Sequence, residues 1–388
     1  MGPIVKGIKD TAIEVLRWSE GYTKTDMVYL AKTGWWVNLN FIITSTLALF
    51  LSIAFANLLS PEIYGIYQYL LSLSALIGAI TLGGMSGAVT QAVSRGYEGA
   101  LRDGMKAQLQ WSIIPTIVSV GISCYYFLHG NSTIGWGLIC IAILTPFIGA
   151  VSTYSAYLNG KREFRTGFYF SLIPTTCYYI SIALALLFLK NALLLLLINL
   201  GVNALATAYA YIRVLKIYKP NREVDPGTVP YGKHLSFMNA FGTILVQFDS
   251  ILVFHFLGPI QLAIYTFASL LPERIAGFFG FIGTAMLPKL ANRSHEEIKN
   301  NIISQVVRVA IVCVIGTVLY IVIAPPVFHL LFPRYINAIL YTQIYAPIIV
   351  LLTILGLVNT TLVAKQQTRR LYIVNFVDIT MREKVGVS

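Results

Sequence analysis

The sequence contains ten continuous apolar stretches, each long enough to cross a lipid bilayer as a helix. Such a crossing takes about 17–25 residues. The stretches lack the alternation of a transmembrane β-barrel, whereas a helix satisfies its backbone hydrogen bonds within the segment, as lipid requires. The stretches are 35–58, 63–84, 108–128, 134–158, 167–189, 192–212, 234–256, 262–287, 302–324 and 336–363.

The composition agrees with a chain that is mostly immersed in lipid. Of its 388 residues 56% are hydrophobic and 11% are charged, whereas soluble domains carry about 25% charged residues. This excludes a soluble enzyme, a disordered protein and a disulfide-rich secreted scaffold. The four cysteines lie inside apolar stretches without a CxxC motif, so we interpret them as buried hydrophobic residues. The predicted fold class is an all-α polytopic membrane protein with about ten transmembrane helices.

The basic residues predict the direction of the helices. The formal net charge is +12, which in a soluble protein would suggest nucleic-acid binding. Here nearly all Lys and Arg residues fall in every second loop and in the terminal segments. Only Lys190 and Arg334 lie in the loops between, and Arg274 lies within a stretch. Arg308, near the start of the stretch 302–324, is counted with the basic loop before it. Because cytoplasmic loops collect positive charge, we expect both termini in the cytoplasm and no nucleic-acid partner.

The loops also predict the domain organisation. The cytoplasmic N-terminal segment carries Ile4, Ile8, Ala12 and Val15 at helical spacing, and it forms either a helix on the membrane surface or a solvated tail. The predicted parts are this segment at 1–34, a first bundle of six helices at 35–213, a proline-rich cytoplasmic linker at 214–233, a second bundle of four helices at 234–364, and a cytoplasmic tail at 365–388.

Two segments on either side of the linker resemble each other. Leu59–Tyr67 and Leu257–Tyr265 share Leu, Pro, Ile and Tyr at the same spacing, and Gly65 aligns with Ala263. Such repeats are typical of transporters that bind substrate between two halves. Since the first half has six predicted spans and the second has four, we expect the last two helices to be missing, as in a truncated or frame-shifted product.

A series of short motifs recurs in the order and spacing of one transporter family. The motifs are Trp35-Trp36-Val37-Asn38, the turn Leu59–Tyr67, Gly83-Gly84-Met85-Ser86-Gly87, Gln247-Phe248-Asp249, Gly258-Pro259, Leu287-Pro288-Lys289-Leu290 and Leu331-Phe332-Pro333. Together they resemble the polysaccharide-biosynthesis transporters, the flippases of O-antigen and lipid-linked oligosaccharides within the multidrug/oligosaccharidyl-lipid/polysaccharide superfamily.

This resemblance implies two helical bundles around an inward- or outward-open central cavity in the plasma membrane. It implies that the cavity carries an undecaprenyl-pyrophosphate-linked oligosaccharide outward by alternating access, for surface polysaccharide synthesis. The expected partners are this lipid-linked substrate, membrane lipids and, as a further expectation, the polysaccharide polymerase and assembly proteins.

Ionisable residues within the spans are the first candidates for a site, because each costs about 2.5–3.5 kcal/mol at a helix centre. We predict that Arg274 binds the pyrophosphate, since a guanidinium can fork onto phosphate oxygens. Asp249 or Glu273 could then carry a coupling proton or cation. The alternative is a structural salt bridge between Asp249 and Arg274 without a role in transport.

Four further residues are weaker candidates for substrate binding. Arg95 lies at the predicted inner mouth of the second span, where it either meets an entering headgroup or serves as a topological anchor. The amides of Asn38, Asn40 and Gln247 either bind sugar in the cavity or form hydrogen bonds between helices.

Three other functions remain open on the sequence. A cation-coupled multidrug-extrusion antiporter would have an acidic and aromatic cavity, and a membrane-embedded polysaccharide polymerase or ligase would have a sizeable outer loop. A non-transporting assembly partner is the third. The chain has no phosphate-binding GxxxxGK motif followed by Ser or Thr, and we expect no enzyme activity, no cofactor and no metal.

Overall fold

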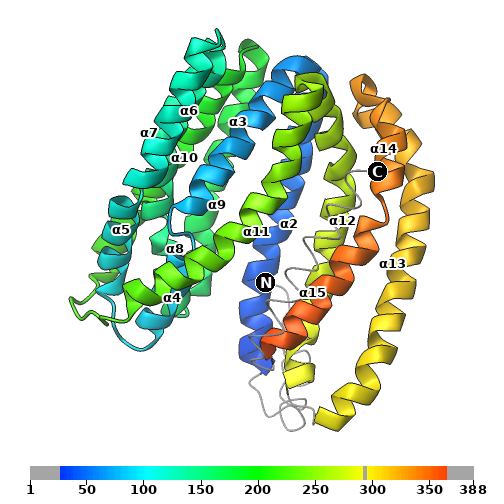
Figure 1. Cartoon of the computed structure of the whole chain (residues 1–388). Coiled ribbons are helices and arrows are strands. Elements are labelled where there is room, and N and C mark those ends of the chain that lie inside the picture. The colour runs from blue at the N-terminus through cyan, green and yellow to red at the C-terminus, as the bar shows by residue number, and fades with distance from the viewer. Residues whose placement is uncertain (1–26, 292–294, 365–388) are drawn as a thin grey trace, which may run out of the picture. The chain divides into compact units, whose positions relative to one another are not determined.

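The computed structural model describes residues 27–291 and 295–364, with side chains at 39–278, 307 and 309–356. The predicted surface helix near Ile4–Val15 and the predicted tail at 365–388 lie outside these residues. The helices are α2 (Met27–Leu58), α3 (Pro61–Ile80), α4 (Met85–Ser94), α5 (Ala100–Trp111), α6 (Ile113–Leu128), α7 (Ser132–Val151), α8 (Thr153–Gly160), α9 (Phe164–Phe188), α10 (Ala192–Tyr218), α11 (Thr228–Leu257), α12 (Pro259–Ala291), α13 (His295–Leu331), the 3-10 helix η1 (Pro333–Tyr335), α14 (Ala338–Tyr345) and α15 (Ile348–Ala364) (Figure 1).

The all-helical membrane fold predicted from the apolar stretches is confirmed. Among the described residues, nine helical segments are long and apolar enough to cross a membrane. The predicted span at 262–287 lies within α12, whose side chains beyond Phe278 are outside the described set.

Contacts divide the chain into two compact units. Unit 1 comprises the described residues within Met1–Phe41, Ala268–Val327 and Ala338–Ser388. Unit 2 comprises Ile42–Phe267 and Phe328–Asn337. Most of the described side chains lie in unit 2.

Short polar caps explain where the helices of unit 2 begin. Ser60 accepts a hydrogen bond from the backbone N–H of Ile63 at 3.4 Å, and Pro61 occupies the first turn, where a missing N–H costs nothing. Asn131 caps α7 and Asn191 caps α10 in the same way. The turns predicted between the apolar stretches are thus confirmed by the side chains that terminate them.

Two of the predicted spans are broken near one end by hydroxyl groups that bond back to the helix. Ser112 donates to the Gln108 carbonyl at 2.6 Å between α5 and α6, and Ser152 donates to the Gly149 carbonyl at 2.7 Å between α7 and α8. Back-bonding of this kind bends helices. The breaks, together with the turn before α4, produce the short helices α4, α5 and α8 at one end of unit 2.

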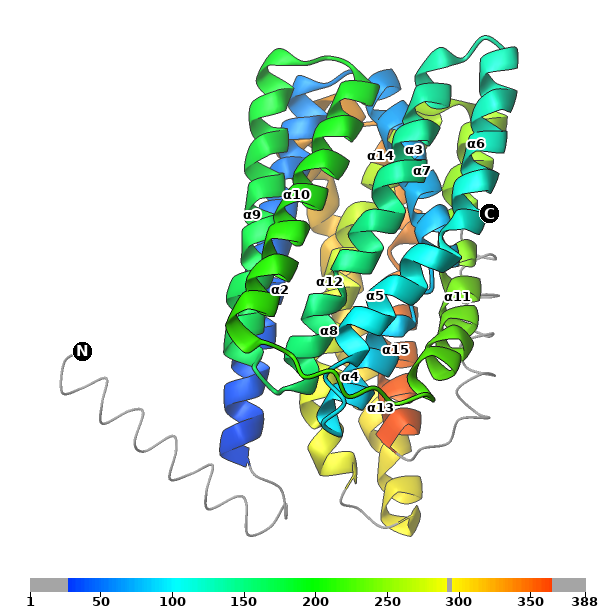
Figure 2. The same ribbon diagram turned by 90° about the vertical axis from the view of Figure 1, so that its left-hand side faces the viewer.

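We call this end the basic end, because it carries the α4–α5 loop, the α8–α9 turn and the α10–α11 connection with their Lys and Arg residues. Figure 2 shows the α10–α11 connection running along this end beside α4, α5 and α8. The opposite end, with the turns around Leu59, Asn131, Lys190 and Gly258, is called the far end.

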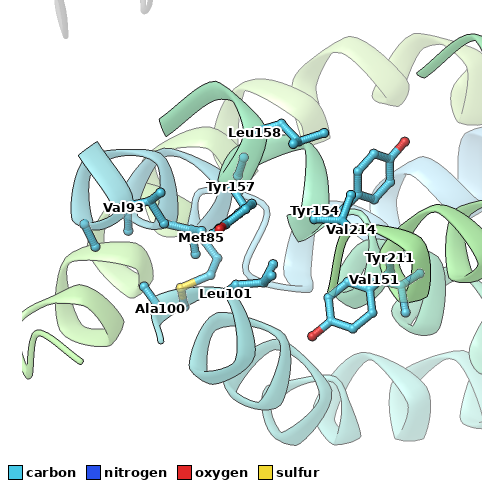
Figure 3. Packing of buried hydrophobic residues seen from close by; sticks show 14 of the residues in the cluster. Met85, Val93, Ala100, Leu101, Val151, Tyr154, Tyr157, Leu158, Tyr211 and Val214 are labelled. Carbon is cyan, nitrogen blue, oxygen red and sulfur yellow. The ribbon is translucent and has the colours of Figure 1, made fainter. Parts of the chain in front are cut away.

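A buried apolar cluster fixes the short helices at the basic end. It includes Met85 and Val89 of α4, Leu101 of α5, and Tyr157 and Leu158 of α8, all fully buried. Figure 3 shows Met85, Leu101, Tyr157 and Leu158 converging from different helices. Because one face of α4 and one face of α8 pack in this cluster, the polar residues on the other side of each helix face away from it.

The far end of unit 2 is closed by aromatic packing. The Phe267 ring lies 4.9 Å from Tyr64 and 4.1 Å from Tyr335, measured between centroids, and all three are buried. The cluster also contains Phe55, Tyr67, Phe328 and Phe332. It joins three segments that are distant in sequence, namely the α2–α3 turn, the start of α12 and the residues around η1.

Unit 1 has its own small core. Tyr320, Ala324, Ala346 and Ile349 are buried together. The Thr342 hydroxyl donates to the Ala268 carbonyl at 2.6 Å and lies 2.6 Å from the Tyr320 hydroxyl. These bonds tie α12, α13 and α14 to one another.

The predicted linker at 214–233 is shorter in the structure, since α10 continues to Tyr218 and α11 begins at Thr228. Helix α11, predicted to open the second bundle, belongs to unit 2. It packs closely there, because the backbone N–H of Gly84 donates to the Ser236 hydroxyl at 3.0 Å and the Phe254 ring stacks on Tyr69 at 3.8 Å. The division of the sequence into two repeated bundles stays a prediction.

Candidate functional site

A carboxylate organises the loops at the basic end. Glu98 accepts a hydrogen bond from Lys161 Nζ at 2.5 Å and one from the Tyr157 hydroxyl at 3.1 Å. The backbone N–H of Asn221, in the α10–α11 connection, donates to the same carboxylate at 3.3 Å. Burial raises the pKa of Glu98, but the bonds from Lys161, Asn221 and Tyr157 outweigh it, so the pKa is lowered overall.

The α4–α5 loop and the α10–α11 connection are joined by further bonds. The Asn221 side chain accepts from the Glu98 backbone N–H at 3.2 Å and donates to the Gly96 carbonyl at 3.1 Å. Arg95 forms an ion pair with Asp225 at 2.5 Å. The connection is thus fastened to unit 2 by both charge and backbone contacts.

A cleft of about 470 Å³ lies between α4 and α8, beside these loops. It is lined by Ser86, Gly87, Thr90, Ser152, Ser155, Ala156 and Asn159. On α4 these residues alternate with the buried Met85 and Val89, so one face of the helix enters the core and the next borders the cleft.

Close helix approach forms the wall of the cleft. Thr90 donates to the Ala156 carbonyl at 3.1 Å across the two helices. A Cβ at Gly160 would stand 2.7 Å from the Thr90 carbonyl oxygen, so α4 and α8 can approach this closely only because residue 160 lacks a side chain. The cleft is therefore a fixed feature of two helices in van der Waals contact.

The predicted site residues of unit 2 lie apart from this cleft. Arg95 is held by Asp225 and lies 5.7 Å from the centre of the Tyr97 ring. Asp249 accepts a hydrogen bond from the Tyr265 hydroxyl at 3.4 Å, between α11 and α12. Gln247 is half-buried on α11.

The remaining predicted residues belong to unit 1. Glu273 accepts a hydrogen bond from the Tyr345 hydroxyl at 3.1 Å, while its neighbour Arg274 is exposed on α12. Asn40 is half-buried on α2, and the side chain of Asn38 lies outside the described set. Since Asp249 belongs to unit 2 and Arg274 to unit 1, their pairing stays a prediction, as do the roles of all seven predicted residues.

The cleft itself was missed by the sequence reasoning, although a signal is present. Ser86 and Thr90 are four residues apart, and Ser152, Ser155 and Asn159 recur at helical spacing, so each set shares one helix face. Small polar residues on two faces become a cleft only when the helices are known to be neighbours, and the sequence does not indicate that α4 packs on α8.

The family model described as polysaccharide biosynthesis protein matches residues 30–293, more than half of the chain. The chain belongs to this polysaccharide biosynthesis family. The match covers α2 to α12 and includes the cleft, the basic-end loops and the far-end turns. No curated protein matches the sequence.

Solved structures similar to this member of the polysaccharide biosynthesis family are transporters of the MOP superfamily. An inward-facing multidrug resistance MATE family transporter has a TM-score of 0.59 at 10% identity, over 89% of this chain and 95% of the other. An outward-facing structure of such a transporter scores 0.57 at 12% identity, over 92% and 86%. A MOP superfamily transporter from Pyrococcus furiosus, described as having a binding pocket of reverse polarity, scores 0.52 at 10% identity, over 92% and 96%. The fold is that of a multi-pass membrane transporter.

Proposed function

We propose that this protein flips a lipid-linked oligosaccharide, carried on undecaprenyl pyrophosphate, across the plasma membrane for surface polysaccharide synthesis. The observation that carries the proposal is the match to the polysaccharide biosynthesis family over residues 30–293. The cleft of about 470 Å³ supports it, because its lining includes uncharged hydroxyl and amide groups, which can form hydrogen bonds with a sugar.

The charge distribution supports an orientation for this transport. Basic loops gather at the end that carries Arg95, Lys161 and Asn221, and cytoplasmic loops are rich in Lys and Arg. We therefore place the basic end and both chain termini in the cytoplasm. The buried aromatic cluster around Phe267 is then a closed outer end of unit 2, which has to open during alternating access.

Charged residues within the helices are the proposed binding groups for the pyrophosphate and for the coupling ion. Arg274, exposed on α12, carries the guanidinium that binds pyrophosphate, since a planar fork matches phosphate oxygens. Glu273, bonded to Tyr345, and Asp249, bonded to Tyr265, are the carboxylates that could take up a proton or cation. Polysaccharide polymerase and assembly proteins are the expected partners on the outer side.

Cation-coupled extrusion of small organic molecules is the second candidate, because the similar solved structures include multidrug resistance MATE transporters. The two functions differ in their cargo, so one experiment distinguishes them. The full chain is reconstituted into lipid vesicles, and movement of a fluorescent polyprenyl-pyrophosphate disaccharide is followed by its protection from a membrane-impermeant quencher. Uptake of ethidium under a proton gradient is measured in parallel.

The proposed function predicts protein-dependent movement of the glycolipid and no ethidium uptake above that of empty vesicles. Ethidium uptake without glycolipid movement would favour the antiporter. Vesicles in which neither cargo moves, with folded protein present, would contradict both candidates and favour a non-transporting role.

A further inference from the structure

The cleft between α4 and α8 offers hydrogen bonds without charge. The described residues that line it are serines, a threonine, an asparagine, a glycine and an alanine, so none of them is ionisable. A hydroxyl group both donates and accepts, and so does the asparagine amide. A ligand rich in hydroxyl groups can likewise donate and accept hydrogen bonds, so it matches this lining.

Three lining side chains have unused hydrogen-bonding capacity. Thr90 donates to the Ala156 carbonyl and Ser152 to the Gly149 carbonyl, so these hydroxyls serve the fold. Among the described residues, no partner forms a hydrogen bond with the side chains of Ser86, Ser155 or Asn159. Lipid cannot satisfy such groups, so water or a polar ligand has to meet them.

Two of the cations that lie near the cleft in the sequence are already neutralised. Arg95, which follows α4, is paired with Asp225, and Lys161, which follows α8, is paired with Glu98. A pyrophosphate would require charged donors, which form shorter and stronger bonds to phosphate oxygens than hydroxyls do. Because none of the described residues that line it is charged, the cleft favours the uncharged part of a glycolipid over its phosphate groups.

Size and rigidity are also suitable. The cleft volume of about 470 Å³ falls within the range of about 300–1,000 Å³ that is usual for small-molecule sites. The apolar cluster around Met85, Leu101 and Tyr157 fixes the two helices that present the lining (Figure 3). We infer that this cleft is the saccharide subsite of the transporter and that Ser86, Ser155 and Asn159 are its specificity-determining contacts. The inference rests on the proposed function.

Binding to the full chain in lipid nanodiscs tests this assignment with two probes. One is a polyprenyl pyrophosphate that carries a disaccharide, and the other is the same lipid without sugar. The double variant Ser155→Ala/Asn159→Ala should bind the disaccharide lipid about tenfold more weakly, because two hydrogen bonds are lost, and should bind the sugar-free lipid as before. Gln91→Ala, at an exposed position of α4 that does not line the cleft, is the control and should change neither affinity.

Each other outcome has a defined meaning. Unchanged affinity of the double variant for the disaccharide lipid would overturn the subsite, and so would an equal loss for both lipids. A double variant with a lowered melting temperature is replaced by Asn159→Ala alone, whose exposed side chain forms no bond to the described protein. If the unaltered chain binds neither lipid, the proposed function fails and the subsite fails with it.

Discussion

Gly65 of α3 lies directly against the backbone carbonyl of Pro259, the first residue of α12, so that a Cβ at position 65 would overlap the carbonyl oxygen. The two residues come from the two turns that resemble each other in sequence. Pro259 is the counterpart of Pro61, and Gly65 is the counterpart of the fully buried Ala263. The repeated turns therefore contact each other at the far end, where the absence of a side chain allows backbone to meet backbone.

Replacement of Gly65 by Ala should separate these turns. The added methyl group meets rigid backbone rather than a flexible side chain, and overpacking of this kind costs about 1–3 kcal/mol. We expect a lower melting temperature of the purified protein. Gly121→Ala is the matched control, because a Cβ there meets nothing within 4 Å and Ala is favoured over Gly in a helix by about 0.5–1 kcal/mol. Equal melting temperatures of the two variants would contradict the close contact.

Removal of the Arg334 side chain should weaken the far end. Arg334 donates to the Leu59 carbonyl at 3.0 Å and Lys190 donates to the Leu58 carbonyl at 2.6 Å, so both cations satisfy carbonyls at the C-terminal end of α2. Cations at a helix C-terminus contribute about 0.3–1 kcal/mol at exposed sites. Arg334→Ala should therefore lower the free energy of unfolding by about 0.3–1 kcal/mol, which a lower melting temperature would show. The exposed Arg213 of α10, changed to Ala, should leave it unaltered.

The network around Glu98 predicts a dependence of stability on pH. Because the folded-state pKa of Glu98 lies below the ordinary value of 4.5, the ionised group stabilises the folded chain above that value. This contribution is lost as the pH falls through the lowered folded-state pKa. Glu98→Gln should be less stable than the unaltered protein at neutral pH, and the difference should shrink in acid. A constant difference in melting temperature from pH 7 to pH 3 would contradict this role.

Among the charged residues, Arg274 is the one whose replacement should affect transport most directly. Arg274→Ala should reduce the initial rate of glycolipid movement in reconstituted vesicles about tenfold or more, because truncation removes the charged donors proposed for pyrophosphate. Arg274→Lys should retain part of the rate, since it keeps the charge but not the fork. An undiminished rate for Arg274→Ala, with equal amounts of protein inserted, would remove this residue from the site.

Much of the fold followed from the sequence, because lipid restricts a chain to few options. Continuous apolar stretches predicted the helices, and the turns around Ser60, Asn131 and Asn191 lie where polar caps interrupt them. The ends of elements were less predictable. The breaks at Ser112 and Ser152 depend on hydroxyl groups that bond back to the helix, which hydropathy does not register.

The candidate site was less predictable than the fold. Charged residues within membrane spans are candidates for a site because their burial in lipid costs free energy. This argument selects Arg274, Asp249 and Glu273. The cleft is lined by small uncharged residues, such as Ser155 and Asn159, which are common in membrane helices. They form a site only if the right helix packs opposite them. That pairing is a property of tertiary packing between α4 and α8, and a single sequence does not specify it.

Reversible locking of the far end tests the central claim of alternating access most directly. Asn57 Nδ2 donates to the Leu331 carbonyl at 3.0 Å, so cysteines at these two positions can be joined by a short thiol-specific cross-linker. The native cysteines, Cys124, Cys140, Cys177 and Cys313, are first changed to Ala. The account predicts that glycolipid movement in vesicles stops when the pair is joined and recovers when a cleavable cross-linker is reduced. Movement at the same rate in the joined and released states would contradict it.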